Sequence, residues 1–91
     1  MGKYARMRLR YLKEHQPAQY ASLLFSGKLN VHLSEIEASA QEMMYTIVSR
    51  LKQERGITEE LKATDQMRWV AEMNTIRETA TEIVNNDLIY A

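Results

Sequence analysis

The chain has 91 residues, no cysteine and a formal net charge of zero, with 45% hydrophobic and 26% charged residues. This length and composition predict one folded domain over 1–91, and they exclude a disordered chain, a disulfide scaffold and thiolate metal sites. The longest uncharged run, 15–27, contains Pro17 and is too short to span a bilayer, so we expect a cytoplasmic protein.

The first two predicted elements are short helices at 3–15 and 17–25. Pro17 disfavours helical geometry at Gln16, which ends the first helix. It also suits the first turn of the second helix, because its missing N–H would have no partner there. Gly27 can adopt the left-handed conformation that closes a helix.

A long third helix is predicted over 30–55, closed by Gly56. Two starts are open for it. Asn30 can serve as the N-cap, or Ser34 and Glu37 can form a capping box three residues apart. The apolar spacing runs unbroken through this region and favours Asn30.

A fourth helix is predicted over 58–88, with Thr58 as its N-cap. A break near Thr64 and Asp65 is compatible with the sequence. We expect the helix to fray over 85–87, where two Asn and one Asp, all poor helix formers, follow each other.

Apolar residues recur at helical spacing on both long helices, at alternating steps of four and three on the fourth. This pattern is typical of packed antiparallel helices. The predicted seam residues are Leu33, Ile36, Met43, Ile47 and Leu51 on the third helix and Trp69, Met73, Ile76 and Ile83 on the fourth. The short link between them permits only a tight reversal. We therefore predict an all-α fold, in which a long antiparallel helical hairpin packs with two short N-terminal helices as a small helical bundle.

The length of the hairpin predicts an unusual shape. A helix over 30–55 spans about 39 Å, whereas a compact chain of this size has a diameter of about 30 Å. Either the fourth helix bends near Thr64, or a second copy covers the overhang, and we favour a homodimer. A second stripe on the fourth helix is half polar and is expected to pack on a smaller or wetter neighbour. It consists of Val70, Asn74, Arg77, Thr81, Val84 and Leu88.

Motifs for catalysis and for cofactor binding are absent from the sequence, which has no phosphate-binding glycine loop, no HExxH and no GxSxG. His32 and Glu35 share a helix face but make at most half a metal site. Glu78 and Glu82 lie opposite the seam, where a solvated face is expected. We therefore predict no catalytic residue, no metal, no cofactor and no enzymatic activity.

The basic first third is the strongest candidate for a binding surface. Residues 1–33 hold six Lys and Arg against one acid, whereas residues 34–91 hold six against eleven. The candidate nucleic-acid-binding residues are Lys3, Arg6, Arg10 and Lys13, which fall within about 80° on one helix, together with Lys28. The competing interpretation is that this stripe pairs with carboxylates of the acidic hairpin or is solvated. Arg8 lies between apolar groups, so we expect it to be buried and paired with a Glu of the third or fourth helix.

Two further surfaces are candidates for binding. A helix-turn-helix over 17–25 and the following helix has the right turn length. Its second helix, however, carries Glu35 and Glu37, which phosphates would repel. Met67 and Tyr45 are expected to be exposed and to mark a contact surface.

Several strings of this sequence, in this order and spacing, resemble the TnpV family of transposon-encoded proteins. They are GKYARMR (2–8), RYLKEH (10–15), SGKL (26–29), TEELKA (58–63), QMRWV (66–70), MNTIR (73–77), EIV (82–84) and LIYA (88–91). The resemblance implies a small protein of bacterial mobile elements and supplies no catalytic residues. Members usually have a further N-terminal segment before the matching region, so the surface that this segment covers in them is expected to be exposed here.

From the residues and the resemblance together, we expect a non-enzymatic accessory protein that acts through helix-mediated protein contacts. Its expected partners are a second copy of itself and other proteins of the mobile element. The alternative is a DNA-binding accessory or regulatory protein of transposition that uses the basic N-terminal helix.

Overall fold

The computed structural model describes residues 1–91 and is entirely helical, which confirms the predicted all-α class. The elements in chain order are α1 (Lys3–His15), α2 (Pro17–Phe25), α3 (Leu29–Glu54), α4 (Glu59–Thr64), α5 (Gln66–Val84) and the π-helical turn η1 (Asn85–Ile89). No helix combines the length and the apolar character needed to cross a bilayer.

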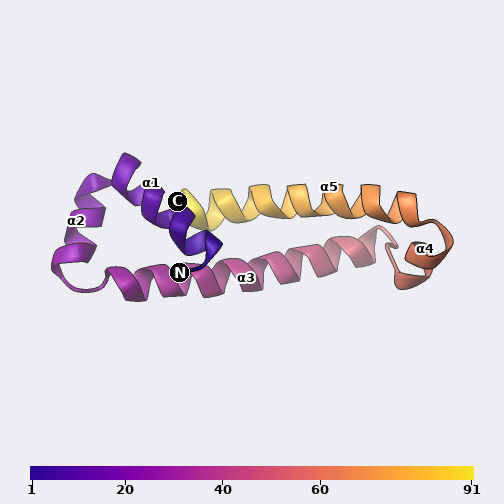
Figure 1. The fold of residues 1–91 in the computed structure, drawn as a ribbon, viewed down its shortest axis with the longest axis horizontal. Helices are drawn as coiled ribbons and strands as arrows, with labels where there is room; N and C mark the ends of the chain where they lie inside the picture. The colour runs from indigo at the N-terminus through magenta and orange to yellow at the C-terminus, as the bar shows by residue number, and fades with distance from the viewer.

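The molecule is an elongated rod, because α3 and α5 run side by side in opposite directions (Figure 1). Its extents are 55 × 19 × 19 Å and its Cα radius of gyration is 16.7 Å, against about 12 Å for a compact chain of this length. Both chain termini lie beside α1, whereas α2 forms one end of the rod and α4 the other (Figure 1). The predicted hairpin is therefore present, and its helices extend beyond a compact globule.

The first two helices begin and end as predicted, but α3 begins one residue earlier than expected. Lys28, and not Asn30, occupies the N-cap position, and it makes no capping hydrogen bond through its side chain. Gly27 has a φ of 74°, the left-handed conformation that ends a helix and reverses the chain. The reversal is complete within one residue, so α3 begins two residues after Gly27. Asn30 therefore lies within the first turn of α3.

The predicted fourth helix is divided at Asp65, the place where the sequence allowed a break. Thr58 caps α4 as predicted, with its hydroxyl oxygen accepting a hydrogen bond from the Leu61 N–H at 3.1 Å. Asp65 then caps α5, since its Oδ1 accepts from the Arg68 N–H at 3.2 Å. The break lets α4 fold beside α5 at the end of the rod, and Ile57 is 3% exposed there.

Packing is concentrated in two small clusters along the rod. The first is formed by Ala40, Val84 and Ile89, with partly buried residues that include Ile36, Met43 and Ile47 around it. The second is formed by Ile57, Met73 and Ile76, with partly buried residues that include Leu51 and Trp69. Leu33 is also buried. Eight of the nine predicted seam residues are thus buried or partly buried.

The C-terminal part of the seam differs from the prediction at Ile83, which is 37% exposed, while Ala80, Val84 and Ile89 are fully buried. The reason is a third partner: η1, which continues α5, packs against α1 as well as α3, and Tyr4 and Met7 of α1 contact the cluster of Ala40, Val84 and Ile89. The cluster that buries Val84 is therefore formed by α1, α3, η1 and the end of α5 together.

The predicted fraying over 85–87 is also wrong, because the chain continues there as η1. The Tyr90 N–H donates to the Asn85 carbonyl oxygen at 2.8 Å, five residues back. This wider turn contains one residue more than an α-turn, so the position five residues after Val84 faces the core. Burial of Ile89 compensates for the poor helix propensity of Asn85 and Asn86.

Candidate functional site

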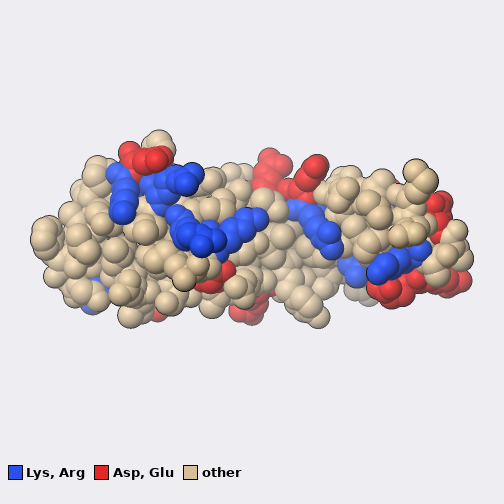
Figure 2. All heavy atoms as spheres, viewed as in Figure 1, with Lys and Arg blue, Asp and Glu red and all other residues tan.

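Four of the predicted nucleic-acid-binding residues form one exposed surface on α1. Lys3, Arg6, Arg10 and Lys13 are all exposed and follow each other over about 15 Å of helix; we call this group the cationic surface. Lys28 is exposed as well, but it belongs to the turn at the far end of α2 and lies apart from the other four (Figure 1). In the space-filling view, Lys and Arg atoms gather over α1 and continue in separate groups along the rod toward α4 (Figure 2).

None of these cations is engaged in an ion pair with a carboxylate, since the only such contact within 4.0 Å joins His15 to Glu14. The Lys3 ammonium lies 5.6 Å from the Tyr4 ring centroid, and that of Lys13 lies 5.7 Å from the Tyr20 ring. These distances are at the outer range of cation–π attraction and leave the charges open to solvent. The cationic surface is therefore available to an external anion.

Arg8 is the exception among the basic residues, because it is buried, with 4% of its surface exposed. Its burial was expected, but its partners were not. Its Nη1 donates to the carbonyl oxygens of Ile89 at 2.9 Å and Ala91 at 2.8 Å, and its Nε donates to His32 Nε2 at 3.2 Å. Arg8 thus joins α1 to α3 and to the C-terminal segment, and no Glu takes part.

The position of Arg8 has an electrostatic reason. The last carbonyl groups of a helix have no partner within the helix, and the helix dipole makes that end negative. Arg8 supplies both donors and a positive charge at the end of η1. Burial lowers the pKa of Arg8 and the nearby Tyr11 opposes this shift, but a guanidinium stays charged in this environment.

His32 must be neutral at the nitrogen that accepts the Arg8 hydrogen bond. Its pKa is lowered from 6.5, first by burial and then by the charge of Arg8, while Glu35 has the opposite effect. His32 is therefore engaged in a structural contact, because its Nε2 already has a partner.

The opposite end of α1 is capped by a carboxylate from another helix. Glu37 Oε1 accepts a hydrogen bond from the Ala5 N–H, in the first turn of α1, at 2.9 Å. This bond is the main cause of a lowered Glu37 pKa, and the charge of Arg6 contributes to the same shift. Gly2 precedes the helix, and a Cβ at Gly2 would overlap the Glu37 carboxylate. Gly2 occupies the N-cap position and has no side chain that could cap α1. This was the one feature of the sequence that indicated a capping group from another helix.

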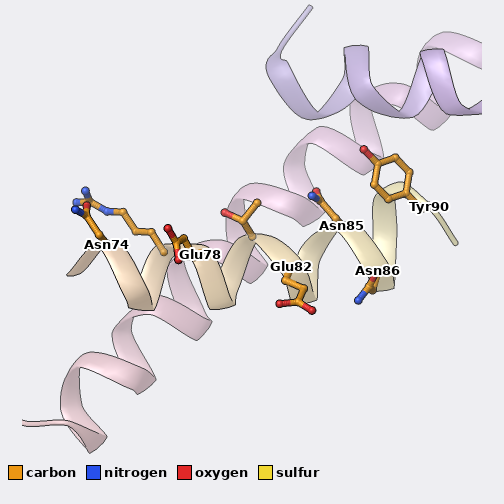
Figure 3. A pocket seen from close by; sticks show the side chains of 8 residues that line it. Asn74, Glu78, Glu82, Asn85, Asn86 and Tyr90 are labelled. Atoms are coloured by element: carbon orange, nitrogen blue, oxygen red, sulfur yellow. The ribbon is translucent and has the colours of Figure 1, made fainter. Parts of the chain in front are cut away.

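Tyr90 lies between two shallow hollows that the sequence did not reveal. One, of about 570 Å³, lies against α1 and includes Arg10 and Tyr11; the Tyr11 and Tyr90 ring centroids are 5.4 Å apart. The other, of about 610 Å³, follows α5, and its lining residues are Asn74, Arg77, Glu78, Thr81, Glu82, Asn85, Asn86 and Tyr90. Figure 3 shows Asn85 and Tyr90 on the side toward α1, whereas Glu82 and Asn86 point away.

The second hollow explains the half-polar stripe predicted on α5. Its C-terminal members Val84 and Leu88 pack in the first cluster, to which α3 and the short helix α1 both contribute side chains. Asn74, Arg77 and Thr81 instead line the open hollow. Since all of its walls come from α5 and the segment after it, this hollow is too open to exclude water from a reaction.

Large apolar side chains are exposed at the end of the rod that α2 forms. Phe25 is 88% exposed, Val31 59% and Leu24 48%; we call these three residues the apolar tip. Tyr45 on α3 and Met67 on α5 are 77% and 85% exposed, as the sequence predicted, but they stand singly on other elements. The apolar tip is therefore the main cluster of exposed apolar side chains.

Comparison with known proteins gives one informative result. A family model described as transposon-encoded protein TnpV matches residues 1–89. No match is found among curated proteins or among solved structures.

Proposed function

The chain belongs to the TnpV family of transposon-encoded proteins, and from that premise we propose that it is a cytoplasmic, non-enzymatic accessory protein of a mobile element. It works through helix-mediated contacts with other proteins, the first of which is a second copy of itself. Other proteins of the mobile element are the further partners.

The observation that carries this proposal is the small amount of surface that the chain buries on its own. Only 11 of 91 residues are buried, and the exposed surface is 6277 Å². A compact monomer of this mass exposes about 5,500 Å². The excess of about 800 Å² equals what one partner contributes to a standard protein–protein interface.

The non-enzymatic role is supported by the structural contacts that the ionisable groups with shifted pKa values make. Shifted pKa values tend to mark catalytic side chains. Here the groups with shifted pKa values are Arg8, His32 and Glu37, and hydrogen bonds that hold α1, α3 and the C-terminal segment together occupy all three.

Sedimentation velocity over about 1–100 μM tests the proposal directly, because a standard-size interface between copies falls in or below this affinity range. We expect a mass that rises from monomer to dimer with concentration. A strict monomer throughout this range, with no co-purifying protein of the element, would contradict the proposal.

DNA binding is the second candidate function, and the absence of carboxylate partners around the cationic surface favours it. If Lys3, Arg6, Arg10 and Lys13 each neutralise one phosphate, log K should fall against log salt with a slope of about −3.6. The double variant Arg6→Glu with Arg10→Glu should abolish binding to a duplex. The control variant, Arg50→Glu on α3 with Arg55→Glu directly after it, should retain most of it. A slope near zero would exclude this function.

A further inference from the structure

Helix α2 is unusual because it is uncharged and yet leaves one whole face exposed. Its nine residues include no Lys, Arg, Asp or Glu, and none of them is buried. A helix without charged residues is expected in the interior of a protein, because its surface gains nothing from contact with water. In the space-filling view the end of the rod that α2 forms is almost free of charged atoms (Figure 2).

The outward face of α2 has the shape of a packing surface. Ala18, Ser22 and Phe25 are exposed and follow each other at steps of four and three, so they share one face. Tyr20 and Leu23 lie on the other side and are partly buried. Two small residues beside one large ring allow another helix to approach closely, with the ring packing beside it.

We propose that α2 docks on α2 of a second copy, antiparallel about a two-fold axis that passes near Ser22, with Phe25 within the contact and Leu24 and Val31 at its edges. This inference rests on the proposed self-association and assigns the surface that mediates it. The two-fold arrangement follows because identical patches in a closed dimer must contact each other.

Charge favours a second copy over a charged partner. Since α2 itself is uncharged, two copies bring no like charges together within the contact. An antiparallel arrangement places the start of one α2 beside the end of the other. Glu14, just before the start of α2, is then near Lys28, just after the end of α2 in the other copy, and both residues are exposed. The opposed helix dipoles add to this complementarity, while Lys13 is directed over the Tyr20 ring of its own copy.

The exposed area also fits. Phe25, at 88%, is the most exposed large apolar side chain of the protein. Leu24 and Val31 are 48% and 59% exposed, so a second copy of α2 would remove apolar surface from water both within the contact and at its edges.

A charge placed in the patch tests the assignment. Phe25→Glu should raise the dimer dissociation constant at least about 30-fold, as for a central aromatic residue of an interface. Met67→Glu is the matched control, because Met67 is 85% exposed and belongs to the first turn of α5, which follows α4 at the opposite end of the rod (Figure 1); it should leave the constant unchanged. Far-UV circular dichroism must show equal helix content in both variants.

A second measurement does not depend on weakening the dimer. The chain has no cysteine, so Ser22→Cys introduces a single thiol close to the proposed axis, where two Cα atoms can come within disulfide range. Mild oxidation should give a covalent dimer at micromolar concentration. Ser49→Cys, at an exposed position of α3, should stay monomeric on a denaturing gel.

The outcomes separate this inference from the proposed function. If the protein dimerises but Phe25→Glu does not weaken the dimer and Ser22→Cys does not cross-link, another surface mediates association, and the assignment to α2 is overturned alone. If the unmodified protein is monomeric at all concentrations, the assignment to α2 fails, and the proposed function fails with it when no protein of the element co-purifies. Capture of a different protein by α2 without a dimer would also overturn the assignment.

Discussion

The two ends of the α3–α5 pair hold together by different means. At one end, which we call the tethered end, α1, η1 and the first half of α3 meet, and hydrogen bonds from Arg8 and to Glu37 join them. At the other, the hairpin end, Ile57 and the first half of α5 pack with α3 through apolar contacts, and α4 packs on α5. The Lys62 ammonium, 4.7 Å from the Trp69 ring centroid, is the main polar group near that cluster.

The difference reflects how the chain reaches each end. The hairpin end joins elements that follow each other in sequence through a short turn, so the covalent link fixes their register and apolar burial suffices. At the tethered end, Arg8 and Ile89 are 81 positions apart in sequence. Apolar contacts are non-directional, so the directional hydrogen bonds of Arg8 and Glu37 define how α1 lies on the α3–α5 pair.

The largest effect should come from the hairpin end. Ile76 is fully buried, and Ile76→Ala should lower the free energy of unfolding by about 3 kcal/mol through lost burial and the cavity that remains. Ile83→Ala is the matched control, because Ile83 is 37% exposed, and it should cost less than about 1 kcal/mol. Urea denaturation checks both, and equal losses would contradict the seam that ends at Val84.

Loss of the Arg8 hydrogen bonds at the tethered end should have the next largest effect. Arg8→Met keeps the apolar stem and leaves two carbonyl groups without their donor, so we expect a loss of about 2–3 kcal/mol. Arg10→Met, on the exposed side of α1, should change stability by less than about 0.5 kcal/mol.

The sole tryptophan shows whether the damage stays local. Trp69 belongs to the hairpin-end cluster, so its fluorescence reports that end, whereas far-UV circular dichroism reports all helices. In Arg8→Met the dichroism midpoint should fall more than the fluorescence midpoint. Coincident midpoints in this variant would mean that the two ends unfold as one unit.

The cap on α1 should contribute less. Gly2→Ala places a methyl group against the Glu37 carboxylate and should cost about 1 kcal/mol, the usual value of an N-terminal cap. In a Glu37→Ala background the same change should cost almost nothing further, because the group that it displaces is gone. Both backgrounds are compared by thermal unfolding. If Gly2→Ala lowered the stability equally in both, Gly2 would act independently of Glu37.

The smallest effect should be a dependence on pH at the tethered end. Because the His32 pKa is lowered from 6.5 in the fold, the unfolded chain binds a proton at His32 more readily than the folded chain does. The free energy of unfolding should therefore decrease as the pH falls below about 6.5. His32→Gln should remove this part of the slope and His15→Gln should leave it. An unchanged slope in His32→Gln would show that Arg8 does not depend on neutral His32.

Local signals along the chain determined most of the helical layout. Pro17, Gly27, Gly56 and Thr58 act through backbone geometry or through hydrogen bonds to residues a few positions away, so their effects are readable from sequence. The spacing of Trp69, Met73 and Ile76 identified the hairpin seam for the same reason. The exposure of the cationic surface followed from the periodicity of α1 alone.

Only the tertiary structure decided the C-terminal register and the partners of the buried charge. Ile83 and Val84 are adjacent and both apolar, and the choice between them depends on a cluster to which α1, α3 and η1 all contribute residues. Arg8 contacts carbonyl groups that every residue possesses, so no residue type marks them in the sequence. Propensities describe a segment by itself, whereas these features arise where three distant segments meet.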